Sequence, residues 1–228
     1  MSVHILRPKF PPPICVIGGD VKIKRMFLKQ EWPTVTNPKD AAILLWTGGS
    51  DVSPSFYGET KMPECGLLDT ERDLHEREIY YKYYNKPSIG ICRGAQFLNV
   101  CNGGRLWQHV DQHAISPPQG HILFSKYTPQ GIAVTSTHHQ MMRPNKELGE
   151  VIGWAFRAKT KIAFQYSQSF PNRCIPKNPF NSKVDDVDPE IVWYKKSKSL
   201  CFQPHPEYGL KSCKDFFFFL LHEYIVKD

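Results

Sequence analysis

The sequence has no apolar run of about 18 residues, the length that a membrane-spanning helix needs. It also has no secretion-signal pattern, because Arg7, Lys9 and the run Pro11-Pro12-Pro13 lie where the apolar part of a signal peptide would be. No internal repeat is present. Of the 228 residues, 41% are hydrophobic and 22% are charged, which is typical of globular proteins and excludes extensive disorder. We therefore expect a single domain over residues 1–228.

Cysteine occurs seven times but never as a Cys-x-x-Cys pair, so a zinc site built from cysteines is not expected. An odd number of cysteines without a secretion signal indicates free thiols in a reducing compartment, and we expect a cytoplasmic protein. The 29 lysine and arginine residues exceed the 22 acidic residues and give a net charge of +7. The lysines are dispersed and no nucleic-acid-binding motif is present, so a nucleic-acid partner is not expected.

Short β-rich runs alternate with longer amphipathic segments along the chain. The expected strands are 14–17, 41–46, 87–91, 132–137, 190–194 and 200–203, and the expected helices are 70–85, 95–101 and 216–226. This alternation predicts an α/β fold with an open, mostly parallel sheet and helices on both faces. Residues 166–189 contain several prolines and little periodicity, and we interpret them as a long loop or lid insertion.

Gly90-Ile91-Cys92-Arg93-Gly94 lies between an expected strand and an expected helix. This is the Gly-x-nucleophile-x-Gly pattern, with cysteine as the nucleophile. A sharp strand-to-helix turn strains the backbone at the nucleophile and requires small neighbours, which the two glycines provide. The positive end of the following helix lowers the pKa of a thiol placed there. The alternative is that Cys92 is an ordinary buried cysteine.

A thiol nucleophile needs a general acid or base with its own orienting group. Gln203-Pro204-His205-Pro206-Glu207 offers both, because residues i and i+2 of an extended segment face the same way and Pro206 favours an extended backbone at His205. Glu207 would then accept from one imidazole nitrogen, and the other would face the sulfur. Active sites of open α/β sheets lie at the carboxyl ends of strands, where Cys92 and His205 are both expected.

Paired glycines, Gly48-Gly49, follow the expected strand 41–46 and would let a ligand approach the backbone closely. Together with the motifs above, the chain resembles class I glutamine amidotransferases, and most closely their γ-glutamyl hydrolase branch, which includes γ-glutamyl-γ-aminobutyrate hydrolase. The segments that carry this resemblance are Gly48–Pro54 with Tyr57-Gly58, Glu71–Asp73 with Glu76, Gly90–Gln96, Asn99-Val100, Gly103–Leu106 with Gln108, Ser136–Gln140 and His205–Glu207.

The resemblance implies a flavodoxin-like fold and a role for each matching residue. Cys92 would attack the γ-carboxamide of a glutamine-like substrate, His205 would transfer protons, and Glu207 would orient His205. The backbone N–H groups of Gly49 and Arg93 would form the oxyanion hole. The glutamyl amino and carboxylate groups would contact a further set of residues, namely Gln96, Ser136, His138 and His139. No cofactor and no metal are implied.

Three other features have simpler interpretations. The adjacent residues His138 and His139 face opposite ways on a strand, which disfavours a metal pair. His109, Asp111 and His113 alternate on one face of any extended segment, which leaves a metal site open as an alternative, but we expect a solvated loop there. The charged residues between Glu71 and Arg77 have the i,i+4 spacing of ion pairs on a solvated helix face, although the resemblance leaves Arg72 and Asp73 a structural role near the site.

The sequence thus predicts a cysteine-dependent amidohydrolase that cleaves a γ-glutamyl amide, glutamine or a γ-glutamyl conjugate, through a γ-glutamyl thioester. Two alternatives stay open. One is a glutaminase subunit that supplies ammonia to a separate synthetase. The other is a non-catalytic binding or regulatory protein on the same fold. The leaving amine is not predicted by any of the motifs.

Overall fold

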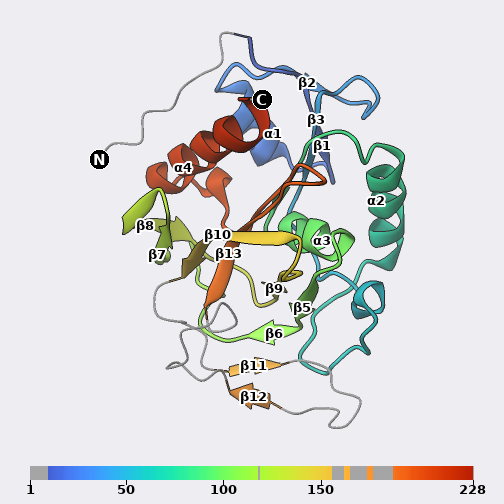
Figure 1. Ribbon diagram of the computed structural model, residues 1–228, viewed down its shortest axis with the longest axis vertical. Coiled ribbons are helices and arrows are strands. Elements are labelled where there is room, and N and C mark those ends of the chain that lie inside the picture. Colours follow the sequence, from blue (N-terminus) through green and yellow to red (C-terminus); the bar gives the residue numbers. More distant parts are fainter. Residues whose placement is uncertain (1–9, 118, 156–161, 165–173, 177–186, 228) are drawn as a thin grey trace.

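The computed structural model describes residues 10–117, 119–155, 162–164, 174–176 and 187–227. Its centre is a nine-stranded sheet with the order β2-β1-β3-β4-β14-β13-β10-β7-β8 (Figure 1). These strands are β1 (Ile14–Ile17), β2 (Thr34–Val35), β3 (Ile43–Trp46), β4 (Ser88–Ile91), β7 (Gly120–Ser125), β8 (Thr128–Thr135), β10 (Gly149–Ala155), β13 (Asp188–Tyr194) and β14 (Ser199–Phe202). The predicted α/β fold with an open sheet is therefore confirmed.

The sheet has two halves. From β2 to β14 all neighbouring strands are parallel, whereas β13, β10, β7 and β8 are added antiparallel. The strands β3, β4, β13 and β14 are buried along their whole length, and most of their residues are apolar. Two smaller sheets lie beside the main one: β5 (Arg105–Trp107) pairs with β9 (Met141–Arg143), and β11 (Ile162–Phe164) pairs with β6 (His109–Val110) and β12 (Cys174–Pro176).

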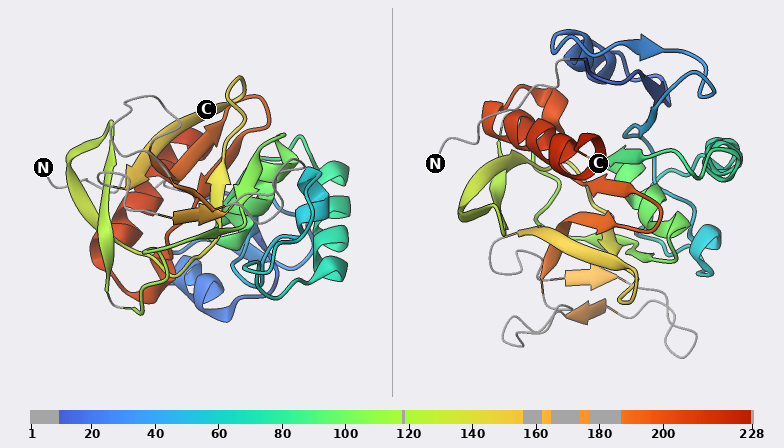
Figure 2. Two further views of the ribbon diagram at one scale, coloured as in Figure 1. Left: turned by 90° about the horizontal axis from the view of Figure 1, so that it is seen from below. Right: turned by 45° about the horizontal axis from the view of Figure 1, so that its top comes forward.

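Helices cover both faces of the sheet (Figure 2). They are α1 (Val21–Leu28), α2 (Thr70–Lys82), α3 (Arg93–Cys101) and α4 (Lys211–Leu221), with 3₁₀ turns at Pro54–Tyr57 and Pro206–Tyr208 and a π-helical turn at His222–Val226. One core cluster packs α1 and α4 on the sheet, and a second packs α2 and α3 on the opposite face. None of the helices among the described residues is long and apolar enough to cross a membrane.

Most of the expected elements are confirmed, with shifted ends. The helix expected at 216–226 begins earlier, at Lys211, and its last turn is π-helical. Within 166–189, expected to be a loop, Cys174–Pro176 forms β12 and Asp188 begins β13. Residues 165–173 and 177–186 lie outside the described part of the chain, so the loop or lid there stays a prediction, as does the single domain.

Helix α1 was not expected from the sequence. The side chain of Asp20 caps it by accepting from the backbone N–H groups of Lys22 and Ile23, at 2.7 and 3.0 Å. One face of the helix then buries Ile23, Met26 and Phe27. The ring of Phe27 makes edge contacts with Trp32, Phe217 and Phe218, which joins α1 to α4.

Phe27→Ala should lower the free energy of unfolding by about 3–5 kcal/mol, because it removes a fully buried aromatic ring between two helices. Leu28→Ala, at the adjacent and 56% exposed position, should change it by less than about 0.5 kcal/mol. Urea unfolding of both variants measures the difference. Equal losses in the two variants would contradict the packing of α1 against α4.

Candidate active site

The loops that follow β3, β4 and β14 meet at one edge of the sheet. Because these strands are adjacent and parallel, their carboxyl ends lie side by side. They place Gly48, Cys92 and His205 next to one another, although these residues are far apart in the sequence. The backbone N–H of Cys92 donates to the carbonyl of Phe202 at 3.0 Å, which ties the two later loops together.

Cys92 lies at a strained turn between β4 and α3. Its φ of 53° and ψ of −111° are outside the usual regions for a residue with a side chain. The turn is possible only because its flanks are glycines. A Cβ atom at Gly90 would lie 2.3 Å from the carbonyl oxygen of Gly94, and one at Gly94 would lie 2.1 Å from that of Trp46. The sharp strand-to-helix turn predicted at Cys92 is thus present in the structure, whereas its role as a nucleophile stays a prediction.

His205 lies against Cys92 and is held from several sides. Its Nδ1 is 2.5 Å from Oε1 of Glu207. Its other edge lies beside Cys92, since a Cβ atom at Gly48 would lie 3.9 Å from Nε2 of His205 and 3.7 Å from Cβ of Cys92. The hydroxyl of Thr135 accepts from its backbone N–H and donates to its carbonyl, both at 2.9 Å. The ring of Tyr208 stacks on the imidazole at a centroid distance of 4.4 Å. Thr135 and Tyr208 had no signal in the sequence.

The backbone around this histidine differs in part from the expectation. His205 itself is extended, with φ −105° and ψ 94°, but Pro206–Tyr208 forms a 3₁₀ turn. The carboxylate of Glu207 reaches the imidazole from the first turn of that short helix. The predicted contact therefore forms although the segment is not extended throughout.

The protonation of His205 follows from its neighbours. Burial lowers the pKa of His205, but the adjacent Cys92 and the hydrogen bond with Glu207 outweigh burial and raise it to about 11. His205 therefore carries its proton at neutral pH. An imidazolium next to a cysteine sulfur stabilises the nucleophilic thiolate and can also donate a proton to a leaving group.

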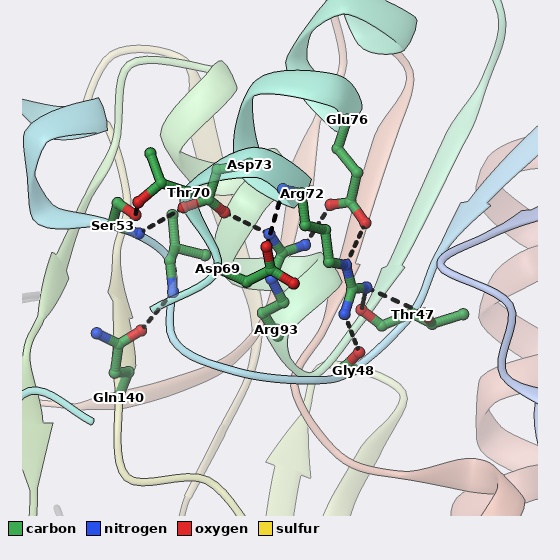
Figure 3. Close-up of polar contacts among 11 residues, drawn as sticks. Thr47, Gly48, Ser53, Asp69, Thr70, Arg72, Asp73, Glu76, Arg93 and Gln140 are labelled. Carbon is green, nitrogen blue, oxygen red and sulfur yellow. Dashed lines mark hydrogen bonds and ion pairs between the residues drawn. The ribbon is translucent and has the colours of Figure 1, made fainter. Parts of the chain in front are cut away.

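A buried ion-pair network joins α2 to the start of α3, next to Cys92 in the sequence (Figure 3). The guanidinium of Arg93, at the start of α3, pairs with Asp73 and Glu76 of α2. Asp73 also accepts from the backbone N–H of Ser53 at 2.9 Å, and Glu76 accepts from Nε of Arg72 at 2.7 Å. Asp73, Glu76 and Arg93 are at most 1% exposed. The expected solvated helix face is therefore wrong for Asp73 and Glu76, because an internal cation pairs with them.

Arg72 extends the network to the glycine loop. It donates to the carbonyl oxygens of Gly48 at 3.0 Å and Thr47 at 3.2 Å. In a trans peptide the carbonyl and the next N–H point in opposite directions. Because Arg72 binds the carbonyl of Gly48, the N–H of Gly49 in the same peptide points away from Arg72. Gly49 has a φ of 150°, and a Cβ there would lie 2.2 Å from Nη1 of Arg72.

The residues expected to contact substrate are not all turned toward Cys92. Gln96 donates to the carbonyl of Gln140 at 2.9 Å and to the side chain of Gln203 at 3.2 Å. Ser136 donates to the carbonyl of His113 at 2.6 Å. These two side chains are buried and make their hydrogen bonds within the fold.

The neighbouring histidines differ sharply in exposure. The side chain of His138 is 2% exposed and makes a hydrogen bond to the carbonyl of Gln140 at 2.8 Å. The side chain of His139 is 32% exposed, and its Nε2 is 3.0 Å from Asp51. The hydrogen bond with Asp51 raises the pKa of His139, and this effect is larger than the lowering of the pKa by burial. Among the expected substrate contacts, His139 has the most accessible side chain.

Comparisons with known proteins identify the family of the chain. A family model described as Peptidase C26 matches residues 39–156. The glutamine amidotransferase-like protein YvdE of Lactococcus lactis subsp. lactis is 38% identical over 125 residues, which are 47% of this chain and 52% of that protein. Protein NtpR of Enterococcus hirae is 29% identical over 136 residues, 48% of this chain and 57% of that protein. The chain thus covers only about half of the length of these relatives.

Solved structures support the fold. A glutamine amidotransferase of Thermotoga maritima superposes with a TM-score of 0.52 at 14% identity, covering 94% of this chain and 84% of that one. PurLQS, also of Thermotoga maritima, superposes with a TM-score of 0.56 at 12% identity, covering 94% and 99%. At such low identities the superpositions establish a shared fold and carry no information about substrate.

Arg93→Met should lower the free energy of unfolding by about 3–5 kcal/mol, because it leaves the carboxylates of Asp73 and Glu76 buried without their cation. As a control, Lys211→Met breaks the surface pair with Asp215, in which the lysine side chain is 84% exposed, and should cost less than about 1 kcal/mol. Chemical unfolding of both variants measures the two losses. If Arg93→Met lowers the free energy of unfolding only slightly, Arg93 is not the cation that pairs with the buried carboxylates of Asp73 and Glu76.

Proposed function

Because the chain belongs to the Peptidase C26 family, we propose that it is a cysteine-dependent amidohydrolase that cleaves a γ-glutamyl amide through a thioester. The observation that carries this proposal is the alignment of Cys92, His205 and Glu207 at one edge of the sheet, with Cys92 at a strained strand-to-helix turn. A thiol, an imidazole and an orienting carboxylate in this order are the parts that acyl transfer needs. Glutamine and γ-glutamyl conjugates are the substrate class that the family resemblance favours.

In the first step the thiolate of Cys92 attacks the γ-carbonyl carbon of the substrate. The carbonyl oxygen becomes an oxyanion, which accepts hydrogen bonds from the N–H groups of Gly49 and Arg93. The contact of Arg72 with the carbonyl of Gly48 supports this role, since it orients the Gly49 peptide before substrate binds. Collapse of the tetrahedral intermediate breaks the C–N bond, and His205 gives its proton to the departing amine.

In the second step the thioester is hydrolysed. His205, now neutral, takes a proton from a water molecule, and the resulting hydroxide attacks the γ-carbonyl carbon. The C–S bond breaks, which releases the γ-carboxylic acid and regenerates the thiolate of Cys92 beside the imidazolium. Glu207 stabilises the charged imidazole in both steps through its contact with Nδ1.

The glutamyl end of the substrate would contact the surroundings of Gln96 and the segment Ser136–His139. The side chains of Gln96, Ser136 and His138 are already hydrogen-bonded inside the fold, so they support the shape of this region. The ring of His139 also has polar contacts, with Asp51 and His109, but it is the most exposed side chain of this set and would meet the substrate most readily.

An electrophilic glutamine analogue should label Cys92, and Cys92→Ala should abolish labelling and lower amide hydrolysis by at least about 1,000-fold. Intact-mass and peptide mass spectrometry identify the labelled residue, and ammonia release from glutamine and a panel of γ-glutamyl amides measures turnover. Cys101→Ala is the matched control, because burial raises the pKa of the Cys101 thiol and disfavours its reaction. This control should label and turn over as the unchanged protein does.

The same experiment separates the alternatives. If no γ-glutamyl amide other than glutamine is hydrolysed and glutamine requires an added synthetase, the protein is an ammonia-supplying glutaminase subunit. If Cys92 is not labelled and no amide is cleaved, the protein keeps the fold without the reaction. Hydrolysis of a γ-glutamyl conjugate by the purified chain alone contradicts both alternatives.

Glu207→Gln should move the alkaline limb of the pH profile for kcat/KM to lower pH. Glu207 helps to raise the pKa of His205 to about 11, and a neutral amide stabilises the imidazolium less. A hydrogen bond to a charged group contributes about 1.5–3 kcal/mol, which corresponds to about one or two pH units. Since the protonated form of His205 donates the proton to the leaving amine, activity is lost as pH rises through its pKa.

The pH dependence of kcat/KM on one γ-glutamyl amide, with enzyme stability checked at each pH, measures this shift. Glu150→Gln is a suitable control, because that carboxylate is on the surface, 56% exposed, and pairs with Lys126. An unchanged alkaline limb in Glu207→Gln would mean that Glu207 does not set the protonation of His205.

A further inference from the structure

Four buried side chains outside the proposed catalytic triad converge on one point. They are His113, which follows β6, His121 on β7, His138, which follows β8, and Glu190 on β13. The side chains are between 0% and 3% exposed, and their nearest nitrogen and oxygen atoms all lie within 4.8 Å of one another. The expectation that 109–113 is a solvated loop is therefore wrong for His113.

The distances from the carboxylate of Glu190 to the three imidazoles fit a bound metal ion. Oε1 of Glu190 is 3.1 Å from Nδ1 of His113, 3.2 Å from Nε2 of His121 and 3.5 Å from Nε2 of His138. In a tetrahedral zinc site with bonds of about 2.0–2.1 Å, neighbouring ligand atoms are about 3.3–3.4 Å apart. The carboxylate oxygen thus already stands at nearly the right distance from all three nitrogens.

The second nitrogen of each imidazole lies near an oxygen acceptor. Nε2 of His113 is 3.1 Å from the carboxylate of Asp188. Nδ1 of His138 is 2.8 Å from the carbonyl of Gln140, and Nδ1 of His121 is 3.3 Å from its neighbouring carbonyl, that of Ile122. Since carbonyls only accept, those nitrogens carry the proton, and a neutral ring then presents a lone pair to the cluster. Metal-binding histidines are oriented in this way.

The cluster is unsatisfied without a further positive charge. Within the described part of the chain, neither Glu190 carboxylate oxygen has a partner in hydrogen-bond geometry, and the same holds for Nδ1 of His113 and for Nε2 of His121 and His138. Buried polar atoms without partners are costly, and a buried carboxylate facing the imidazole lone pairs of His121 and His138 is more so. A cation at the centre would satisfy all four groups at once.

We propose that His113, His121, His138 and Glu190 bind one divalent transition-metal ion, with zinc as the best match. Imidazole nitrogens with one carboxylate suit zinc better than calcium or magnesium, which take mainly oxygen ligands. Four protein ligands in a buried setting leave no open position, so the ion is structural and takes no part in the amide cleavage.

Its position gives the ion a mechanical role near the active site. The ion would join β7, β13 and the segments that contain His113 and His138. The last of these segments begins just after Thr135, whose hydroxyl holds the backbone of His205, and ends near His139. Metal binding would therefore fix the part of the chain that borders both the triad and the proposed glutamyl contacts.

The test uses the full chain, stripped of metal with a chelator and titrated with Co²⁺ and then Zn²⁺. We expect one Co²⁺ per chain with the intense visible absorption of a four-coordinate ion, its replacement by one Zn²⁺, and a higher thermal midpoint in the zinc form. Asp188→Asn, which removes the negative charge of the acceptor behind His113, should weaken zinc binding by about 10–100-fold. His121→Gln and Glu190→Gln should weaken it further, whereas the exposed His75→Gln should not.

Each result is decisive without any measurement of catalysis. If the stripped protein binds no Co²⁺ with a four-coordinate spectrum, the proposal is wrong. In that case protonated histidines supply the positive charge beside Glu190. Equal binding by folded His121→Gln would place the ion elsewhere and would also overturn it. Should a ligand variant fail to fold, the metal content and Co²⁺ spectrum of the unchanged chain still decide, and they do so whether or not Cys92 is a nucleophile.

Discussion

The buried guanidinium of Arg93 is the group on which the geometry of the candidate active site most depends. It fixes the start of α3, directly after Cys92, against Asp73 and Glu76 of α2. Through Glu76 it also positions Arg72, which holds the glycine loop. Buried ion pairs add little net stability compared with apolar packing, but separating them is costly. The network therefore selects one relative placement of α2, α3 and the glycine loop.

The two halves of the sheet contribute differently. The parallel half brings the carboxyl ends of β3, β4 and β14 together, and so places the glycine loop, Cys92 and His205 side by side. The antiparallel half provides support: Thr135 at the end of β8 holds the backbone of His205, and Glu190 on β13 gathers the three histidines. The proposed reactive groups thus follow parallel strands, and one of the groups that restrain them, Thr135, comes from a strand added beyond β14.

Local patterns were enough to predict the central strands, the nucleophile turn and the contact between His205 and Glu207. Each depends on residues that are close in the chain. The turn at Cys92 also requires the small flanking residues Gly90 and Gly94, which the sequence shows directly. The buried role of Asp73 and Glu76 was not predictable in this way, because their spacing on α2 is the same as that of a solvated ion-pair face. Only the packing of α3 against α2 supplies the cation that allows their burial.

The pair His138-His139 shows how the same rule leads to two conclusions. Adjacent residues of an extended segment face opposite ways, which argued against a metal bound by both. In the fold that alternation turns His138 inward, toward Glu190, and His139 outward, toward Asp51. The rule was correct about the pair, but the partners of His138 come from His113, His121 and Glu190, which are distant in sequence. A site assembled from four separate segments has no local spacing, and so only the three-dimensional structure reveals it.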